Sequence, residues 1–571
     1  MGAFTKAFGN NAQHGAMLKQ DANALGFLPT NTASQNVTAW NALKSGIVNI
    51  TTPGVYDINS TLLLNSNTTY NFCEGCTIRK TGDKTTYLHI FLNRGALTYS
   101  ADSNIKFFGH GLRLMVNGLD DTTLGIVRCM FAQFQFHKVT NFIVDGYYIN
   151  DGGTYQFLMS LSDCRFGFVT NTSFYGNKDC FKMVACSDIT VDQITTSSRD
   201  DGISICANDY LYNSPSVGDC ERISISNWTD NPYVGGLSNA ILFLQDSWSD
   251  FVSGATYVRQ ETISNNGRIY KKTSPNASNV STVAPTHTTG SVTGADGITW
   301  RWYADSTVKS VTVRDITLTN VSILSNRNFI GFDVDTLPAN KAGLAKMENI
   351  VIDNLTFNPA TAYKSIIRNS GRMGTVTLKN SNINPSLPIA VYSGVQNLKV
   401  SNMDNLIIDN STIGLSVPYS VLGQCDNNAL IGMSKYTITN STVNTSTSNG
   451  ALFGPSRTGQ FTDVVFTDVI FNSLFTMIAQ TAGWTQDMSI LATRCSFRTP
   501  RQLLGINNNP GNVIKFTSRG CTYETPTLNL FTNGNVGSSL TIDVAGSIGT
   551  PTPSKVKGTN VTVIALDLPI V

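Results

Sequence analysis

The segments LIIDNSTI (residues 406–413) and YTITNSTV (residues 436–443) decide the fold, because the second repeats the pattern of the first. In each segment an apolar residue occupies every second position, an Asn follows, and an apolar residue returns three positions after the Asn. Alternation with a period of two is typical of a β-strand, and Asn tolerates the left-handed backbone of a tight bend. Each segment therefore predicts two short strands that flank one bend.

Eight other segments follow the same template: FIVDGYYI (142–149), ITVDQITT (189–196), ISISNWTD (223–230), VTVRDITL (311–318), IVIDNLTF (350–357), VTLKNSNI (376–383), VVFTDVIF (464–471) and ILATRCSF (490–497). The bend position recurs at Asp315, Asn354, Asn380, Asn410, Asn440, Asp468 and Arg494. Successive bends are about 26–39 residues apart, which is the length of one solenoid repeat, and stacked repeats of this kind form one continuous core. We therefore predict an all-β fold, a right-handed parallel β-helix in which each step is one coil.

Composition and charge agree with strands and turns and exclude several partners. Charged residues make up 14% of the chain, well below the roughly 25% of an average soluble domain. A net charge of +2 provides no field that would attract a phosphate backbone or an anionic membrane surface. Because the chain shows neither a long apolar run nor the apolar core of a signal peptide, we expect a soluble product made in the cytoplasm.

The 11 cysteines show no framework spacing. Cys73 and Cys76 have the spacing of a redox motif or of half a zinc site, but no second pair or nearby His completes a metal site. We expect reduced and mostly buried thiols, and neither a metal nor a cofactor.

The spacing of the coils also indicates the domain organisation. Residues 37–64 predict a helix, a strand, a Pro-Gly turn and a strand, an arrangement that would cap the open end of the solenoid. The interval between Asn227 and Asp315 is about three times the length of a coil and indicates an insertion. We predict five regions: an attachment and capping segment (1–35), a first β-helix part (36–249), an inserted β-module (250–305), a second β-helix part (306–525) and a C-terminal trimerisation region (526–571).

Three carboxylates form the candidate catalytic site. GNKDCFKM (176–183) and SRDDGISI (198–205) superpose when Asp179 is aligned with Asp201, a step that corresponds to one coil. These two residues should stack about 4.8 Å apart on neighbouring coils, with Asp200 beside them. Converging carboxylates repel one another, so one holds a proton while another stays ionised, which is the split that glycoside hydrolysis requires.

The strings NKD (177–179) and RDD (199–201) resemble, in order and spacing, the site of the polygalacturonase-like glycoside hydrolases of family 28. The resemblance implies that Asp200 is the general acid, that Asp179 and Asp201 orient and deprotonate water, and that the sugar is inverted. Asn177 would be a hydrogen-bonding neighbour. The Gly-His-Gly and Arg-Ile-Lys strings of the family do not follow Asp201, so Lys182 or Arg199 would bind a sugar other than galacturonate. A GHG string at 109–111 precedes the site and predicts a tight turn in which His110 is structural.

Further residues are candidates for binding substrate. Gln245 and Asp246 end the coil before the insertion and would extend the groove, and Trp300 and Trp302 in the insertion offer flat faces for sugar rings. The same aromatics are equally suited to form the core of a small module. Asp333 and Asp335 are a rival carboxylate pair, which we interpret as part of a surface strand.

Two regions resemble phage tail proteins. Residues 37–64 resemble the start of the pectate-lyase-like β-helix of phage tailspikes, and residues 257–303 resemble a small β-module common in phage tail proteins. The resemblance implies a homotrimeric virion protein that docks to another tail or adaptor protein through its N-terminus and depolymerises a bacterial capsular polysaccharide or lipopolysaccharide. Two alternatives stay open: a polysaccharide lyase acting by β-elimination, and a receptor-binding spike without enzymatic activity.

Overall fold

The computed structural model describes residues 18–81, 89–116, 132–150, 157–208, 216–235, 238–257, 261–274, 280–334, 346–357, 366–369, 372–383, 390–391, 402–415, 424–425, 433–445, 451–453, 463–472, 476–480, 487–498, 502–506, 513–524, 531–533, 539–547, 556–558 and 561–565. The chain divides into two compact units, residues 1–237 with 248–313 and residues 238–247 with 314–571. Among the described residues, no helix has the length and apolar character needed to cross a membrane.

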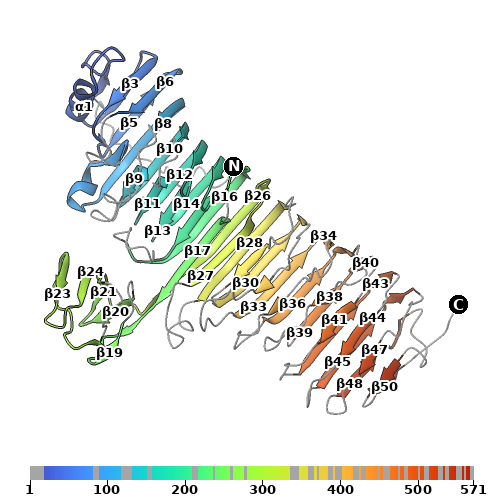
Figure 1. The fold of residues 1–571 in the computed structure, drawn as a ribbon. Coiled ribbons are helices and arrows are strands. Elements are labelled where there is room, and N and C mark those ends of the chain that lie inside the picture. The colour runs from blue at the N-terminus through green and yellow to red at the C-terminus, as the bar shows by residue number, and fades with distance from the viewer. Residues whose placement is uncertain are drawn as a thin grey trace. The chain divides into compact units, whose positions relative to one another are not determined.

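The first unit has one helix near its N-terminal end and is otherwise built of stacked parallel strands (Figure 1). Its elements before the insertion are β1 (Lys19–Asp21), α1 (Ala33–Ala42), β2 (Ile47–Ile50), β3 (Gly54–Ile58), β4 (Leu62–Leu64), β5 (Thr68–Phe72), β6 (Cys76–Lys80), β7 (Phe91–Asn93), η1 (Arg94–Thr98), β8 (Asp102–Met115), β9 (Ala132–His137), β10 (Val139–Asn150), β11 (Phe157–Ser162), β12 (Arg165–Gly176), β13 (Phe181–Val184), β14 (Ser187–Ser198), β15 (Ile203–Cys206) and β16 (Cys220–Asp230). The helix, strand, turn and strand predicted in residues 37–64 are confirmed. The coil stack starts earlier than residue 36, because β1 already pairs in parallel with β2.

Equivalent residues of successive coils lie in register and form the core. Val144, Val169, Val191 and Ile225 occupy one such row through the pairings of β10, β12, β14 and β16, and all four side chains are fully buried. Nine cysteines among the described residues are free, and all but Cys73 are buried. This agrees with the expected reduced thiols.

The second unit is also built of stacked parallel strands (Figure 1). Its strands are β17 (Asn239–Ser247), β26 (Val313–Ile323), β27 (Asn328–Val334), β28 (Lys346–Phe357), β29 (Ile367–Asn369), β30 (Arg372–Lys379), β31 (Asn382–Ile383), β32 (Ala390–Val391), β33 (Asn402–Asp409), β34 (Thr412–Leu415), β35 (Gln424–Cys425), β36 (Met433–Thr439), β37 (Thr442–Thr445), β38 (Ala451–Phe453), β39 (Asp463–Thr467), β40 (Ile470–Asn472), β41 (Thr476–Gln480), β42 (Met488–Thr493), β43 (Ser496–Arg498), β44 (Gln502–Ile506), β45 (Val513–Arg519), β46 (Thr522–Tyr523), β47 (Phe531–Asn533), β48 (Ser539–Asp543), β49 (Val556–Gly558) and β50 (Val561–Ala565). The predicted parallel β-helix is confirmed.

All seven predicted bend residues adopt left-handed backbone, with φ between 43° and 58°. Asp315, however, lies at a different bend from the other six. Its side chain accepts a hydrogen bond from Asn349 at 2.9 Å, whereas Asn354 bonds to Asn320 at 2.8 Å. Both bonds join residues 34 positions apart, which is the true length of this coil. The interval from Asp315 to Asn354 was too long because the alignment joined two different bends.

The bends are held together by polar ladders. The Asn410 amide donates to Asn380 at 2.7 Å, and Asn380 donates to Asp353 at 2.7 Å. The serine after each Asn forms a second ladder, in which Ser411 Oγ accepts from the backbone of Ser381 at 3.1 Å. The Asn-Ser strings are thus explained as coil bends.

The coil stack extends beyond the boundary that we placed at residue 525. Gly520 and Gly546 continue the series of left-handed bends after Arg494, with φ of 62° and 72°. The strand β48 pairs with β45, and β50 pairs with β48, all in parallel. The template was missed because glycine, which adopts left-handed backbone without a side chain, replaces Asn at these two bends. A trimerising role for residues 526–571 stays a prediction.

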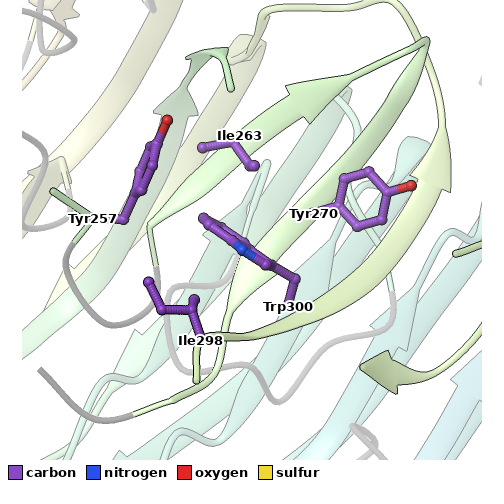
Figure 2. Close-up of a cluster of buried hydrophobic side chains, with 5 residues drawn as sticks. All are labelled: Tyr257, Ile263, Tyr270, Ile298 and Trp300. Carbon is purple, nitrogen blue, oxygen red and sulfur yellow. The ribbon is translucent and has the colours of Figure 1, made fainter. Parts of the chain in front are cut away.

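The insertion forms a small β-module with its own core. Its strands are β18 (Ser249–Asp250), β19 (Ala255–Thr256), β20 (Thr262–Asn265), β21 (Arg268–Lys272), β22 (Val280–Ser281), β23 (Ser291–Thr293) and β24 (Thr299–Asp305), and β18, β20, β21, β24 and β23 form one sheet. The strand β25 (Ser310–Val311) follows the module. Figure 2 shows the buried cluster in this module: Tyr257, Ile263, Tyr270, Ile298 and Trp300. The module contacts the coils through Asn208, whose amide donates to Thr262 at 3.4 Å.

Replacing Asn410 tests the contribution of a bend to stability. Asn410→Ala forces a Cβ-bearing residue into left-handed backbone and removes the bond to Asn380, so we expect the free energy of unfolding to fall by about 1–3 kcal/mol. Asn410→Gly loses the same bond without backbone strain and should be about 1 kcal/mol more stable than the Ala variant. Urea unfolding followed by far-ultraviolet circular dichroism measures both. Equal stability of the two variants would contradict the role of the left-handed bend.

Candidate active site

Asp179 and Asp201 lie at equivalent positions of neighbouring coils, as the alignment of their two segments predicts. The strand β13 begins just after Asp179, β15 begins just after Asp201, and the two strands pair in parallel with Phe181 opposite Ile203. The backbone N–H of Cys180 donates to the carbonyl of Asp201 at 3.1 Å. Both carboxylates therefore leave the chain at the same place, just before a rigid strand.

Asp200 completes a group of three carboxylates. One carboxylate oxygen from each of Asp179, Asp200 and Asp201 lies within 4.8 Å of the others. Asp179 and Asp201 are buried, at 4% and 5% exposure, whereas Asp200 is partly exposed. Asp200 is thus the carboxylate of the three that is most accessible to a substrate.

Two lysines and a serine compensate the charge of this group. Lys178 forms an ion pair with Asp200, and its Nζ lies 3.7 Å from Asp179 Oδ1. Lys182 Nζ lies 3.9 Å from Asp179 Oδ2 and 4.3 Å from the centre of the Phe157 ring. Ser204 Oγ donates to Asp179 Oδ2 at 2.6 Å. Lys178 therefore bridges a buried carboxylate and an accessible one.

The surroundings of Asp179 and Lys178 shift the pKa of each group. Burial raises the pKa of Asp179, the nearby Lys178 lowers it, and the negative charge of Asp200 raises it again, so that the net shift is upward. Burial lowers the pKa of Lys178, but the charges of Asp179 and Asp200 outweigh this effect and the pKa is raised. Lys178 thus stays protonated, and Asp179 holds a proton more readily than an ordinary carboxyl group.

Among the described residues, this trio is the one group of three or more His, Cys, Asp or Glu side chains with the spacing of metal ligands. The ammonium group of Lys178 already neutralises part of its charge. The arrangement suits proton transfer between a buried and an accessible carboxylate.

The proposed substrate-binding residues near the trio differ in exposure. Asn177 is partly exposed and Arg199 is exposed, which leaves both available to a ligand. Lys182 is only 4% exposed, and its contacts are with Asp179 and Phe157. Lys182 is thus covered and acts on Asp179, and direct binding of a sugar by Lys182 stays a prediction.

The remaining candidate residues that the structure describes belong to other strands. Gln245 and Asp246 belong to β17 of the second unit and are buried, at 1% and 6% exposure. Asp333 is on β27, and Asp335 lies outside the described residues. His110 lies within β8 and adopts left-handed backbone with φ of 48°, so the chain bends there inside a strand and does not form a separate turn.

The position of Trp300 corrects the expectation that it binds substrate. Its side chain is 1% exposed and packs edge-on against Tyr257 at 5.2 Å between ring centres (Figure 2). A ring buried in the module core cannot stack on a sugar, so the expectation that Trp300 binds substrate is wrong. Trp302 packs against the same cluster but is only partly buried.

Sequence reasoning missed Lys178, Ser204 and Phe157. The register that aligns Asp179 with Asp201 also aligns Lys178 with Asp200 and places Lys182 opposite Ser204. Applying the same register to every residue of the two segments would have revealed both pairs. Phe157 carries no signal of its own.

No family model and no curated protein matches this sequence. Among solved structures, a double mutant of the tailspike of E. coli bacteriophage HK620 is similar, with a TM-score of 0.50, 10% identity and coverage of 95% of this chain and 80% of the tailspike. An exopolygalacturonase of Thermotoga maritima has a TM-score of 0.43, 10% identity and coverage of 79% and 92%. The family 28 exopolygalacturonase of Yersinia enterocolitica has a TM-score of 0.41, 11% identity and coverage of 82% and 78%. The fold of this chain is thus the parallel β-helix that the HK620 tailspike also adopts.

The burial of Trp300 predicts that it is needed for the folding of the module. We expect Trp300→Ala to destabilise the module by about 3–5 kcal/mol, the usual cost of removing a buried aromatic side chain. Limited proteolysis should then cut Trp300→Ala within residues 250–305 faster than the wild type. The variant Trp302→Ala should be cut more slowly than Trp300→Ala. Equal resistance of Trp300→Ala and the wild type would show that the cluster does not hold the module together.

Proposed function

We propose that this protein is a phage tailspike depolymerase that hydrolyses glycosidic bonds in a bacterial surface polysaccharide, either a capsule or a lipopolysaccharide. The observation that carries the proposal is the group of three carboxylates on two adjacent coils, in which a buried Asp179 with a raised pKa lies beside an accessible Asp200. Clustered like charges with a perturbed pKa are typical of catalytic sites that transfer protons.

In the proposed mechanism, Asp200 contacts the glycosidic oxygen, because it is the most exposed of the three. It takes up the proton that the buried Asp179 holds and passes this proton to the glycosidic oxygen, which leaves Asp179 ionised. Asp179 and Asp201 orient the water that attacks the sugar and accept its proton. Lys178 lies within reach of both Asp179 and Asp200, so it can balance the charge of whichever of these two is ionised while the other holds the proton.

The spacing of the carboxylates does not by itself predict the stereochemistry. Inverting pairs usually stand about 6.5–9.5 Å apart, which is wider than the spacing within this trio. Inversion is proposed from the resemblance to family 28 alone. Proton NMR of the first anomer released from a polysaccharide distinguishes inversion from retention.

The proposed setting of this activity is the phage virion. A homotrimer assembled through residues 526–571, and docking of the N-terminal segment to another tail or adaptor protein, complete the proposal. The tailspike of bacteriophage HK620 shares the fold of this chain, which is consistent with this setting.

A polysaccharide lyase is the second candidate, and the cations beside the carboxylates favour it. Lyases neutralise a uronate with basic side chains, and Lys178 and the exposed Arg199 flank the trio. A lyase produces unsaturated uronates that absorb ultraviolet light, whereas a hydrolase produces reducing ends without that absorbance. A spike that only binds glycan produces neither.

Asp200→Asn tests the proposed general acid. We expect cleavage of the polysaccharide to slow by about 10²–10⁴-fold, since the amide cannot donate the proton. The assay incubates a panel of capsular polysaccharides with the protein and sizes the products by mass spectrometry. Asp57→Asn is the matched control, because Asp57 is likewise paired with a cation on the next coil, Arg79, outside the site. Unchanged cleavage by Asp200→Asn would refute the assignment.

Lys178→Met tests the electrostatic role of the lysine. Lys178 lowers the pKa of Asp179, so its removal raises that pKa further. The acidic limb of the pH profile of kcat/KM, where Asp179 must lose its proton, should then move to higher pH by about one unit or more. Arg79→Met should leave the profile in place. A shift to lower pH would exclude Asp179 as the titrating group.

A further inference from the structure

The first unit contains a polar pocket that shares no residue with the three carboxylates of the candidate active site. Its volume is about 380 Å³, within the roughly 300–1,000 Å³ of small-molecule sites. One wall consists of bends from three successive coils, at the starts of β12, β14 and β16. The other wall comes from the insertion and includes Ile269, Ser306 and Val308. We call this cavity the bend pocket.

Phe166 occupies a bend at which the neighbouring coils carry polar residues. The in-register pairing of the coils places it in one row with Asn141, Asp188 and Arg222. All four residues have left-handed backbone, with a φ of 54° at Phe166. The other three side chains are polar, whereas that of Phe166 is aromatic. Left-handed backbone is rare for a bulky residue.

Phe166 also contributes nothing visible to the core, because 59% of its surface is exposed. The ladder is polar on either side of it. Asn141 donates to Asn104 at 2.6 Å, and Arg222 donates to Asp188 at 2.7 Å. A strained and exposed aromatic ring in a polar row is costly for folding alone, and such positions concentrate at functional sites.

The polar groups around Phe166 include both hydrogen-bond donors and acceptors. Arg165 Nη2 lies 3.8 Å from Asp163 Oδ1, and Arg222 bonds to both Asp188 and Glu221. Asp163 is partly covered, and burial raises its pKa. Pairs of this kind present fixed oxygen acceptors and N–H donors to the hydroxyl groups of a sugar, while an exposed aromatic face suits its C–H face.

The charge of the pocket selects among sugars. Its lining includes four carboxylates, from Asp163, Asp188, Asp219 and Glu221, against two guanidinium groups, from Arg165 and Arg222. This negative balance disfavours uronates, phosphates and other anions. We propose that the bend pocket is a second glycan-binding site, which holds one or two neutral hexopyranose units against Phe166. The pocket would bind the polysaccharide whether or not the carboxylates cleave it.

Saturation-transfer NMR with small glycosides tests this site directly. The probes are the methyl glycosides of glucose, galactose, mannose and N-acetylglucosamine, with galacturonate and inorganic phosphate as anionic probes. We expect transfer to the C–H protons of at least one neutral glycoside, and none to galacturonate. Stronger transfer to galacturonate than to the neutral glycosides, or competition of a neutral glycoside with phosphate, would overturn the proposed chemistry. If no neutral glycoside receives transfer from the protein, the site itself is refuted.

Phe166→Asn is the informative variant, because Asn is the residue that the preceding coil carries at this bend and it tolerates left-handed backbone. Folding should therefore be preserved while affinity falls about tenfold or more through loss of the aromatic anchor. Tyr99→Asn is the matched control, since Tyr99 is 48% exposed and has a φ of 57° but does not line the pocket. The proposal would be refuted if both variants lost the same affinity for the glycoside, or if Phe166→Asn bound it as tightly as the wild type.

Asp200→Asn separates this site from the proposed active site. Transfer to the neutral glycoside should persist in Asp200→Asn and in the wild type alike, whether or not the protein cleaves a polysaccharide. If Asp200→Asn abolishes the transfer, the sugar binds at the carboxylates and the bend pocket is not its site.

Discussion

Every feature of this molecule depends on parallel pairing of successive coils in register. Each coil hydrogen-bonds through its backbone to the coils before and after it, so residues at equivalent positions form straight rows. An apolar row becomes core, as at Val144, Val169 and Val191, and a row of Asn becomes a polar ladder. A shift by one residue would exchange core and surface along the whole stack, and the register is therefore strongly specified.

The same constraint explains why charges can be brought together beneath the surface. Asp179 and Asp201 are held one above the other because their strands are paired, and not because their side chains attract. Buried charges are costly unless they are compensated. Lys178 and Lys182 provide the compensation, and each comes from the same short coil segment as Asp179. Backbone pairing thus supplies the stability that allows an electrostatically unfavourable group to exist.

The repeat could be read from the sequence wherever a bend has a polar residue, since Asn and Asp commonly mark left-handed backbone. Gly520 and Gly546 were missed because glycine is also common in ordinary loops. Asp315 was assigned to the wrong row because each coil has more than one polar bend, and spacing alone does not distinguish them. The stacking of the aspartates was predictable from the alignment of their segments. The burial of Trp300 was not, because an aromatic residue of a small module can either form its core or face a ligand. The exposure of Phe166 was not, because the template predicts a polar residue at that bend.

The insertion leaves and rejoins the coil at adjacent points, where the backbone N–H of Trp248 donates to the carbonyl of Lys309 at 2.9 Å. The ends of the module are thus already closed by the coil, and the length of the loop between them adds little to the cost of folding. During evolution, a module of different sequence can replace this one without disturbing the register of the rows. Recombination at this junction would change one wall of the bend pocket while leaving the carboxylates in place, so the two groups of residues can evolve separately.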